Sequence, residues 1–206
     1  MADFETELPD VIVTGKRLSS VGFSISDFKN NIGNIVRPNL FVAEFEPGPK
    51  FANYLSTIDS EFIERFPFRC EVAEFPGKSL ATTEDTGGAG PTLKLPYDVT
   101  FNDINMTIIC AEDMKERQFF ESWMDSIVAP VKSKSISGLV NFYENYAEGN
   151  KLSISQLDAK ATNLITFSMY DIYPVAISPM TASWEETNTY QRFSVTMTYR
   201  YYQLHE

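Results

Sequence analysis

Apolar and polar residues alternate most strictly near the end of the chain. From residue 192 to residue 202, apolar side chains occupy every second position and mostly polar ones lie between them. Alternation with a period of two over such a length is typical of a β-strand with one dry face and one wet face. The pattern predicts a single closing strand, and its buried face would carry Phe193, Val195, Met197, Tyr199 and Tyr201.

Shorter patterns of the same kind predict further strands. Ile104, Met106 and Ile108 alternate with polar neighbours, so this strand should also have one buried face. Clusters of Pro and Gly, such as Pro47-Gly48-Pro49, mark the ends of several segments. We therefore expect a mainly β fold, with other extended segments at residues 40–45, 68–75, 141–146, 151–157 and 163–173.

One segment has helical spacing instead. Glu112 and Asp113 suit the positive end of a helix, and Ala129-Pro130 would end it. Between them, apolar residues recur every four positions and form one broad face, which consists of Phe119, Phe120, Trp123, Met124 and Ile127. We expect a single helix that covers a sheet with this face, although an aromatic stripe could instead cradle a ligand.

Three segments lack a sustained period. Residues 1–36 mix acids, glycines and short apolar pairs, which predicts an N-terminal arm in front of a domain at residues 37–206. Residues 50–66 are expected to be an insertion in that domain, with a short amphipathic helix. Residues 76–99 are rich in polar residues and glycine, and we expect a loop there, with a flexible connection over residues 82–91.

Composition limits the kind of function. The net charge of -11 argues against binding to a nucleic-acid backbone, which requires Lys and Arg to displace counterions. Cys70 and Cys110 stand alone, so we expect buried free thiols and neither a zinc site nor a disulfide framework. The chain has no signal-peptide core and no apolar run of about 20 residues, so neither secretion nor a membrane-spanning segment is expected.

The sequence offers no catalytic, cofactor-binding or metal-binding residues. The only histidine, His205, is the penultimate residue. The run Gly87-Gly88-Ala89-Gly90 is not followed by the Gly-Lys-Ser/Thr that a phosphate loop requires. A hydrolase with paired carboxylates remains an alternative, because one sequence does not reveal which Asp and Glu meet in space.

The order of these segments resembles the tail tube protein family of contractile-tailed bacteriophages over about residues 36 to 203. Each motif is short, and the resemblance rests on their shared order. The motifs are Arg37-Pro38-Asn39-Leu40-Phe41, residues 70–77, Thr100-Phe101-Asn102-Asp103, residues 117–123, Tyr173-Pro174-Val175, Ser183-Trp184 and the closing strand.

The resemblance implies a tail-tube-like β-sandwich or barrel with one flanking helix, whose strands join those of neighbouring subunits into a ring-shaped barrel. Hexameric rings would stack into the inner tube of a contractile tail, and DNA would pass through the lumen without sequence-specific binding. The chain would then be a structural virion protein without cofactors, assembled in the host cytoplasm. Its partners would be other copies, the tail sheath, the baseplate hub or initiator, and the tape measure protein.

The same resemblance implies where rings would touch, because comparable loops of the family contact the adjacent ring. The candidate inter-ring contacts are Phe75, Pro76, Gly77, Gly87, Gly88 and Gly90. Two alternatives stay open: a baseplate tube-initiator ring of the same fold, and the tube of a phage-like contractile injection or type VI secretion system. The arm and the insertion exceed what a minimal tube subunit needs. They fit a baseplate tube initiator as well as a main tube protein with longer contacts between rings. The sequence also leaves open which acidic residues would line the lumen.

Overall fold

The computed structural model describes residues 35–55, 61–85, 87, 92–128, 140–185 and 188–205. Within it, residues Arg37–Glu206 form one compact unit. Most of the expected N-terminal arm, as well as Gly88 and Gly90, lies outside the described residues.

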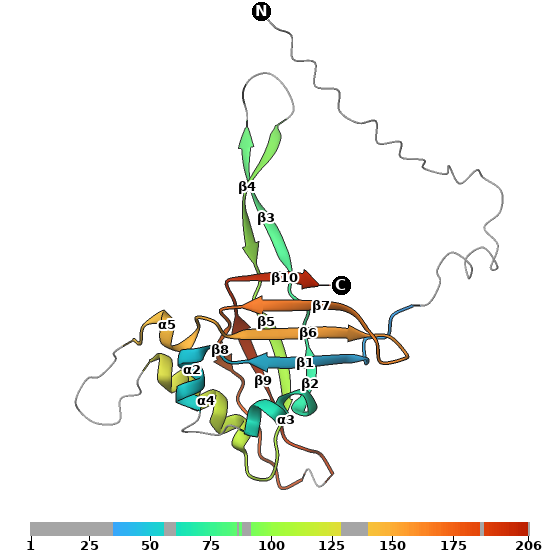
Figure 1. Cartoon of the computed structure of the whole chain (residues 1–206), viewed down its shortest axis with the longest axis vertical. Coiled ribbons are helices and arrows are strands. Elements are labelled where there is room, and N and C mark those ends of the chain that lie inside the picture. The colour runs from blue at the N-terminus through green and yellow to red at the C-terminus, as the bar shows by residue number, and fades with distance from the viewer. Residues whose placement is uncertain are drawn as a thin grey trace, which may run out of the picture. The chain divides into compact units, whose positions relative to one another are not determined.

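Two four-stranded antiparallel sheets form the body of this unit (Figure 1). The first sheet has the order β1 (Phe41–Glu46), β6 (Lys151–Leu157), β7 (Asn163–Tyr170) and β10 (Tyr201–His205). The second has the order β2 (Cys70–Ala73), β5 (Ile104–Ile109), β9 (Arg192–Thr198) and β8 (Tyr173–Ile177). In Figure 1 the strands of the first sheet run across the view, and those of the second run up and down behind them. The expected mainly β architecture is confirmed.

A third pair of strands, β3 (Lys78–Asp85) and β4 (Leu93–Phe101), forms a long hairpin that extends beyond both sheets (Figure 1). The expectation of a loop over residues 76–99 is therefore wrong for most of this segment. The two strands pair from Lys78↔Phe101 to Asp85↔Leu93, with one register shift between Ala81 and Thr82. The polar composition suggested a loop because nearly all residues of the hairpin are exposed to solvent in this chain.

The expected helix is α4 (Lys115–Ile127), and three shorter helices accompany it: α2 (Pro49–Leu55), α3 (Glu61–Arg69) and α5 (Tyr143–Tyr146). The insertion thus contributes two helices. The strand expected at residues 141–146 is wrong, because α5 occupies this segment. Its two tyrosines are three residues apart and so lie on one side of the helical turn, where they pack edge-on with each other and with Tyr173.

Aromatic side chains form the centre of the core, where α2, α3 and α4 pack against the sheets. Phe119, Phe120 and Trp123 of α4 are each 1% exposed, whereas Met124 and Ile127 are half-buried. The indole Nε1 of Trp123 donates a hydrogen bond to the carbonyl oxygen of Tyr146 at 3.1 Å. These α4 rings meet those of the insertion and β1, which are Phe45, Phe51, Phe62 and Phe66.

The closing segment is two strands and not one. β9 ends at Thr198 in the second sheet, and β10 begins at Tyr201 in the first. Phe193, Val195, Met197 and Tyr199 are buried as expected, but Tyr201 is 38% exposed and Tyr202 packs against the core instead. The chain changes sheets at residues 199–200, and this shifts the buried positions from odd to even numbers. The sequence does not reveal this change because Tyr201 and Tyr202 are the same residue type, so either could belong to the buried face.

Candidate assembly surfaces

The described part of the chain has none of the usual signs of a chemical site. No group of three or more His, Cys, Asp or Glu within it could hold a metal ion. Burial raises the pKa of the Cys70 thiol to about 12, so this thiol is protonated at neutral pH and is a poor nucleophile. Within the same residues, no helix combines the length and the apolar character that crossing a membrane requires.

The first sheet ends in two strands, β1 and β10, that are each hydrogen-bonded to a neighbouring strand on one side only. The amide of Asp171 donates to the carbonyl oxygen of Asn150 beside β6, so by alternation the backbone groups of Ser168 point from β7 toward β10. Gln203 lies opposite Ser168 and directs its amide at β7, so the N–H groups of Tyr202 and Leu204 point away from β7. The outer side of β10 therefore presents backbone donors that another strand can pair with.

The two faces of the first sheet differ in chemistry. One face carries buried apolar residues such as Leu152, Ile154 and Met169. The opposite face carries small hydroxyl side chains in cross-strand pairs: Ser153 Oγ lies 3.2 Å from Ser168 Oγ, and Ser155 Oγ lies 2.8 Å from Thr166 Oγ1. The hydroxyls thus bond to one another across β6 and β7.

Charged side chains on this hydroxyl face are concentrated at its β1 edge. Glu44 and Glu46 lie in the same rows as the serine and lysine of β6, since Glu44 pairs with Ser153 and Glu46 with Lys151. The ammonium group of Lys151 is 3.2 Å from a carboxylate oxygen of Glu46. The face is therefore mostly neutral, and its one described lysine is already paired.

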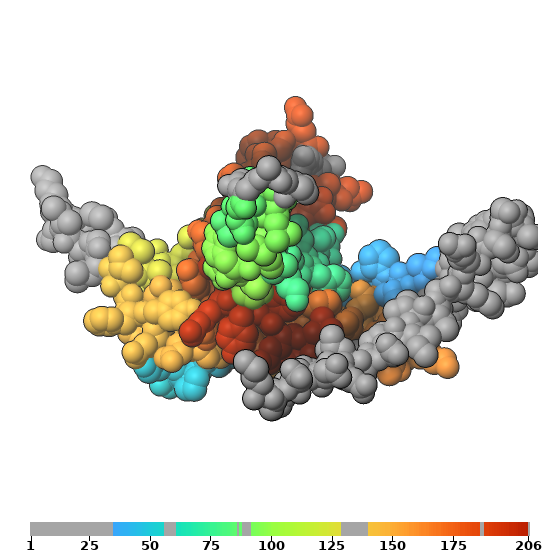
Figure 2. Space-filling model, turned by 90° about the horizontal axis from the view of Figure 1, so that it is seen from above, coloured from blue at the N-terminus to red at the C-terminus, as the bar shows by residue number. Residues whose placement is uncertain are grey.

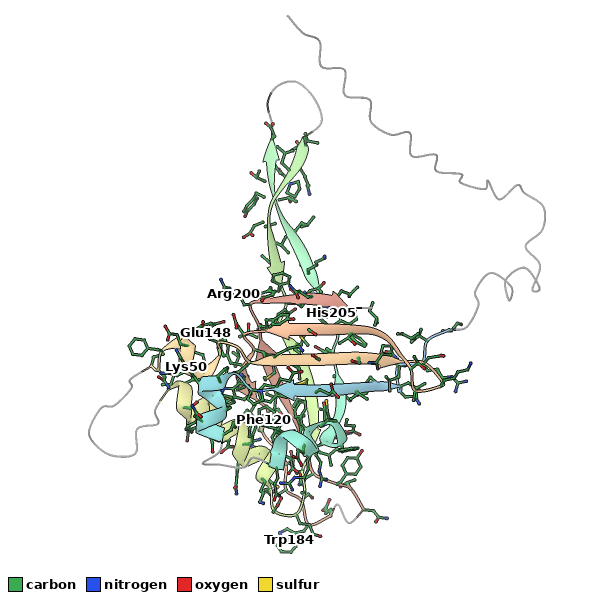
Figure 3. The ribbon with its side chains drawn as sticks, viewed as in Figure 1. Lys50, Phe120, Glu148, Trp184, Arg200 and His205 are labelled. Atoms are coloured by element: carbon green, nitrogen blue, oxygen red, sulfur yellow. The ribbon has the colours of Figure 1, made fainter. Side chains whose placement is uncertain are left out.

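The hairpin has apolar side chains that nothing else in the described chain covers. Leu93, Leu95, Tyr97 and Val99 alternate with polar residues or proline along β4, and they are 42% to 71% exposed. A register shift between Ala81 and Thr82 places Leu93 and Leu95 on one face of the hairpin, and Val99 with its partner Leu80 on the other. In Figure 3 the hairpin side chains point away from both strands, and in Figure 2 no other coloured segment covers the hairpin. The alternation at residues 93–101 was the sequence signal for this strand, and our reading of the segment as a loop missed it.

The residues at the base of the hairpin attach it to the body. The Phe75 ring lies 5.0 Å from the Phe167 ring, and Pro76 is buried. The hydroxyl of Tyr199 donates to the carbonyl oxygen of Gly77 at 3.4 Å. Gly87 lies at the other end of the hairpin, next to its tip. The candidate inter-ring residues that the structure describes therefore divide between the base and the tip.

Trp184 is a further exposed aromatic residue, and the hairpin lies at the opposite end of the unit (Figure 3). Trp184 lies on the connection between β8 and β9, and its side chain is fully exposed to solvent. Exposed tryptophans in such positions are frequent anchors of protein–protein contacts. The Ser183-Trp184 motif appeared in the sequence only as part of the family resemblance.

The chain matches the family model described as phage tail tube protein over residues 36–205. It is 23% identical over 173 residues to tail tube protein gp19 of Enterobacteria phage T6, and the match covers 83% of this chain and 93% of that protein.

Two solved structures have the same fold. A chain of the anti-feeding prophage baseplate superposes with a TM-score of 0.57 at 11% identity, and the match covers 84% of this chain and 96% of that one. A chain from the sheath/tube terminator structure of the PVC extracellular contractile injection system gives 0.55 at 13% identity, covering 85% and 99%. The family match extends over almost the whole compact unit. The protein therefore belongs to the phage tail tube protein family.

Proposed function

We propose that this chain is a structural subunit, and not an enzyme, that forms hexameric rings stacked into the inner tube of a contractile phage tail. The tube serves as the conduit for DNA ejection. The observation that carries the proposal is the first sheet, which ends in two strands with partners on one side only. Family membership supports the same conclusion.

The directions of the four strands suit closure into a ring. Successive neighbours in β1, β6, β7 and β10 are all antiparallel, so β1 and β10 run in opposite directions. When β10 of one copy pairs with β1 of the next, the new pair is therefore antiparallel as well. Such a head-to-tail contact closes into a ring by rotation, and the resulting barrel leaves no free edge in this sheet.

The hydroxyl face is the side that we assign to the lumen. The second sheet and the core helices lie on the apolar face of the first sheet, and this bulk requires the larger outer circumference of a ring. The inner wall then contains Ser153, Ser155, Thr166 and Ser168, and the three serines are only 2% to 8% exposed within the subunit. Glu44 and Glu46 are its carboxylates. Such a wall offers a phosphate backbone few cations to bind, so DNA passes without sequence-specific contacts.

The hairpin is our proposal for the contact between successive rings, in place of the loop that the sequence suggested. Leu95→Asp, on the hairpin face that carries Leu93 and Leu95, is expected to prevent stacking, because a carboxylate would be buried without a partner in the contact. Thr82→Asp is the matched control, since Thr82 pairs opposite Pro96 on the other face of the hairpin. Negative-stain microscopy should show isolated rings for Leu95→Asp and tubes for Thr82→Asp. Tubes of normal length from both variants would remove the Leu95 face from the contact.

The partners that we propose follow from the relatives. Structures of similar fold come from a baseplate and from a sheath-tube complex, as their descriptions state. We infer that this chain meets a tail sheath on its outside, the baseplate hub or initiator at one end, and a tape measure protein in the lumen. It would assemble in the host cytoplasm and remain in the virion. The similarity to a baseplate chain keeps a tube-initiator ring as the second candidate function.

The purified protein, examined by light scattering and negative-stain microscopy, tests the proposal. Long hollow tubes with regular striations are the expected result for a main tube subunit. Isolated rings would favour the baseplate initiator instead, because an initiator needs a partner to continue the tube. A protein that stays monomeric even after seeding with assembled baseplates would contradict both.

A further inference from the structure

A groove of about 740 Å³ runs beside strand β2, on the side where that strand has no neighbour. Its walls come from the segment before β1, from β2 itself and from the base of the hairpin. Phe41, Val72 and Phe75 give the groove a largely apolar surface. Val72 is 50% exposed and Phe75 41% exposed, so these side chains line an open surface and not a closed core.

The backbone of β2 can accept another strand along this groove. The amide of Glu74 donates to the carbonyl oxygen of Asn105 on β5, so the amide of Ala73 points into the groove by alternation. Two of the three carboxylates that line the groove already have partners: Glu71 accepts from Tyr190 at 2.6 Å, and Glu74 accepts from the Asn105 amide at 2.9 Å. The third is Asp103. A strand can therefore enter without leaving Glu71 or Glu74 unpaired.

The β3–β4 hairpin has the properties that this groove requires. It is an extended strand pair with a free edge on each side and uncovered apolar side chains. It continues the direction of β2 and β5 (Figure 1), so a copy displaced along this direction would lay its hairpin beside the β2 of its neighbour. A hairpin cannot fill the groove of its own chain, because Gly77 and Asn102 at its base already form part of the wall.

We propose that the hairpin of one copy lies in the β2 groove of a copy in the next ring and adds a strand to that sheet. This inference rests on the proposed tube function and adds the receiving site to it. Hydrogen bonds between backbone groups would give affinity. Packing of the apolar hairpin side chains against Phe41, Val72 and Phe75 would give specificity. The contact is heterologous, so it repeats from ring to ring without closing on itself.

Two variants of the full chain separate the donor from the acceptor. Ala73→Pro removes the outward amide of β2 without removing a bond to β5, so this protein keeps a working hairpin and loses the groove. Leu95→Asp keeps the groove and loses the hairpin. We expect each variant alone to form single rings, and rings of the two variants mixed in equal amounts to form stacks of two that grow no further. Sedimentation velocity would show a species of about twice the ring mass only in the mixture.

The controls make each outcome decisive. Ala73→Ser keeps the amide and should form tubes, whereas Val72→Lys should repeat the effect of Ala73→Pro if proline disturbs folding. Tubes from Ala73→Pro alone, or single rings in the mixture, would overturn the proposal. If the unchanged protein forms no rings, the proposed ring is wrong, but the hairpin contact can still be tested. Monomers of Ala73→Pro and Leu95→Asp are then mixed in equal amounts. A dimer of one donor and one acceptor would support it, and monomers would refute it.

Discussion

Asn150→Ala is expected to lower the free energy of unfolding by about 2 to 4 kcal/mol, because it removes a buried partner from the Gly48 amide and from the Ile172 carbonyl, whereas the Tyr146 carbonyl keeps its bond from Trp123. The Asn150 side chain is completely buried. Its Oδ1 accepts from the Gly48 amide at 2.8 Å, and its Nδ2 donates to the carbonyl oxygens of Tyr146 at 2.7 Å and Ile172 at 3.2 Å. One amide thus holds together the start of α2, the end of α5 and the chain between β7 and β8.

The packing around this amide leaves no room for rearrangement. A Cβ atom added to Gly48 would lie 2.3 Å from the carbonyl oxygen of Glu148, and Gly149 has a φ of +81°, which favours glycine. The backbone at this junction therefore has little freedom to close over the space that the lost side chain leaves. Differential scanning calorimetry should show a decrease of roughly 10 °C in Tm, from about 2 to 4 °C per kcal/mol for a domain of this size.

Asn145→Ala is the matched control for this measurement. Asn145 lies on α5 near the same junction and donates to Asn141 Oδ1 at 2.8 Å, but its side chain is in solvent. Its loss should change the free energy of unfolding by less than about 1 kcal/mol, because water replaces the partner. Equal decreases in Tm for both variants would contradict the role that we give to the buried network.

Leu204→Pro is expected to abolish ring formation while leaving the monomer folded. Leu204 lies on β10 and pairs with Phe167 on β7. Its amide points away from β7, so proline removes a donor that the monomer does not use. The ring would lose that donor, and the proline ring would also obstruct the approach of β1 from the next copy. Size-exclusion chromatography with light scattering should show monomers at concentrations where the unchanged protein forms rings.

Leu204→Ala separates the backbone effect from the loss of the side chain. The alanine variant keeps the outward amide and loses only the Leu204 side chain, which is 49% exposed. It should form rings as the unchanged protein does. Circular dichroism melts of both variants should stay within a few degrees of the original. Rings from Leu204→Pro would show that β10 is not the joining strand, and the tube would then need another lateral contact.

The core strands and the main helix follow from the sequence because their pattern has a local cause. Residues 151–157 form β6 with the bounds expected, and β5 buries Ile104, Met106 and Ile108 as their alternation predicts. On α4, the spacing of Phe119 and Trp123 identified the side that faces the core. In each case one element packs against one apolar surface, so its period shows directly in the sequence.

Predictions from the sequence were wrong where a segment contributes to both sheets or projects away from the core. The closing strand changes sheets at residues 199–200, so its alternation continues in the sequence while its buried face changes. The hairpin alternates at residues 93–101, but its apolar side chains have no core in their own chain, and the glycines near its tip suggested a loop.

By itself, the sequence determined a mainly β domain, its apolar core positions, the absence of an obvious catalytic motif and the order of segments that resembles the tail tube family. Only the tertiary structure decided which strands end the sheets, which face of the first sheet carries the hydroxyl pairs, and where the hairpin projects. The reason is physical: burial within one strand or helix leaves a periodic trace along the chain. The edges of a sheet depend instead on which distant segments pair, such as β1 with β6 and β7 with β10.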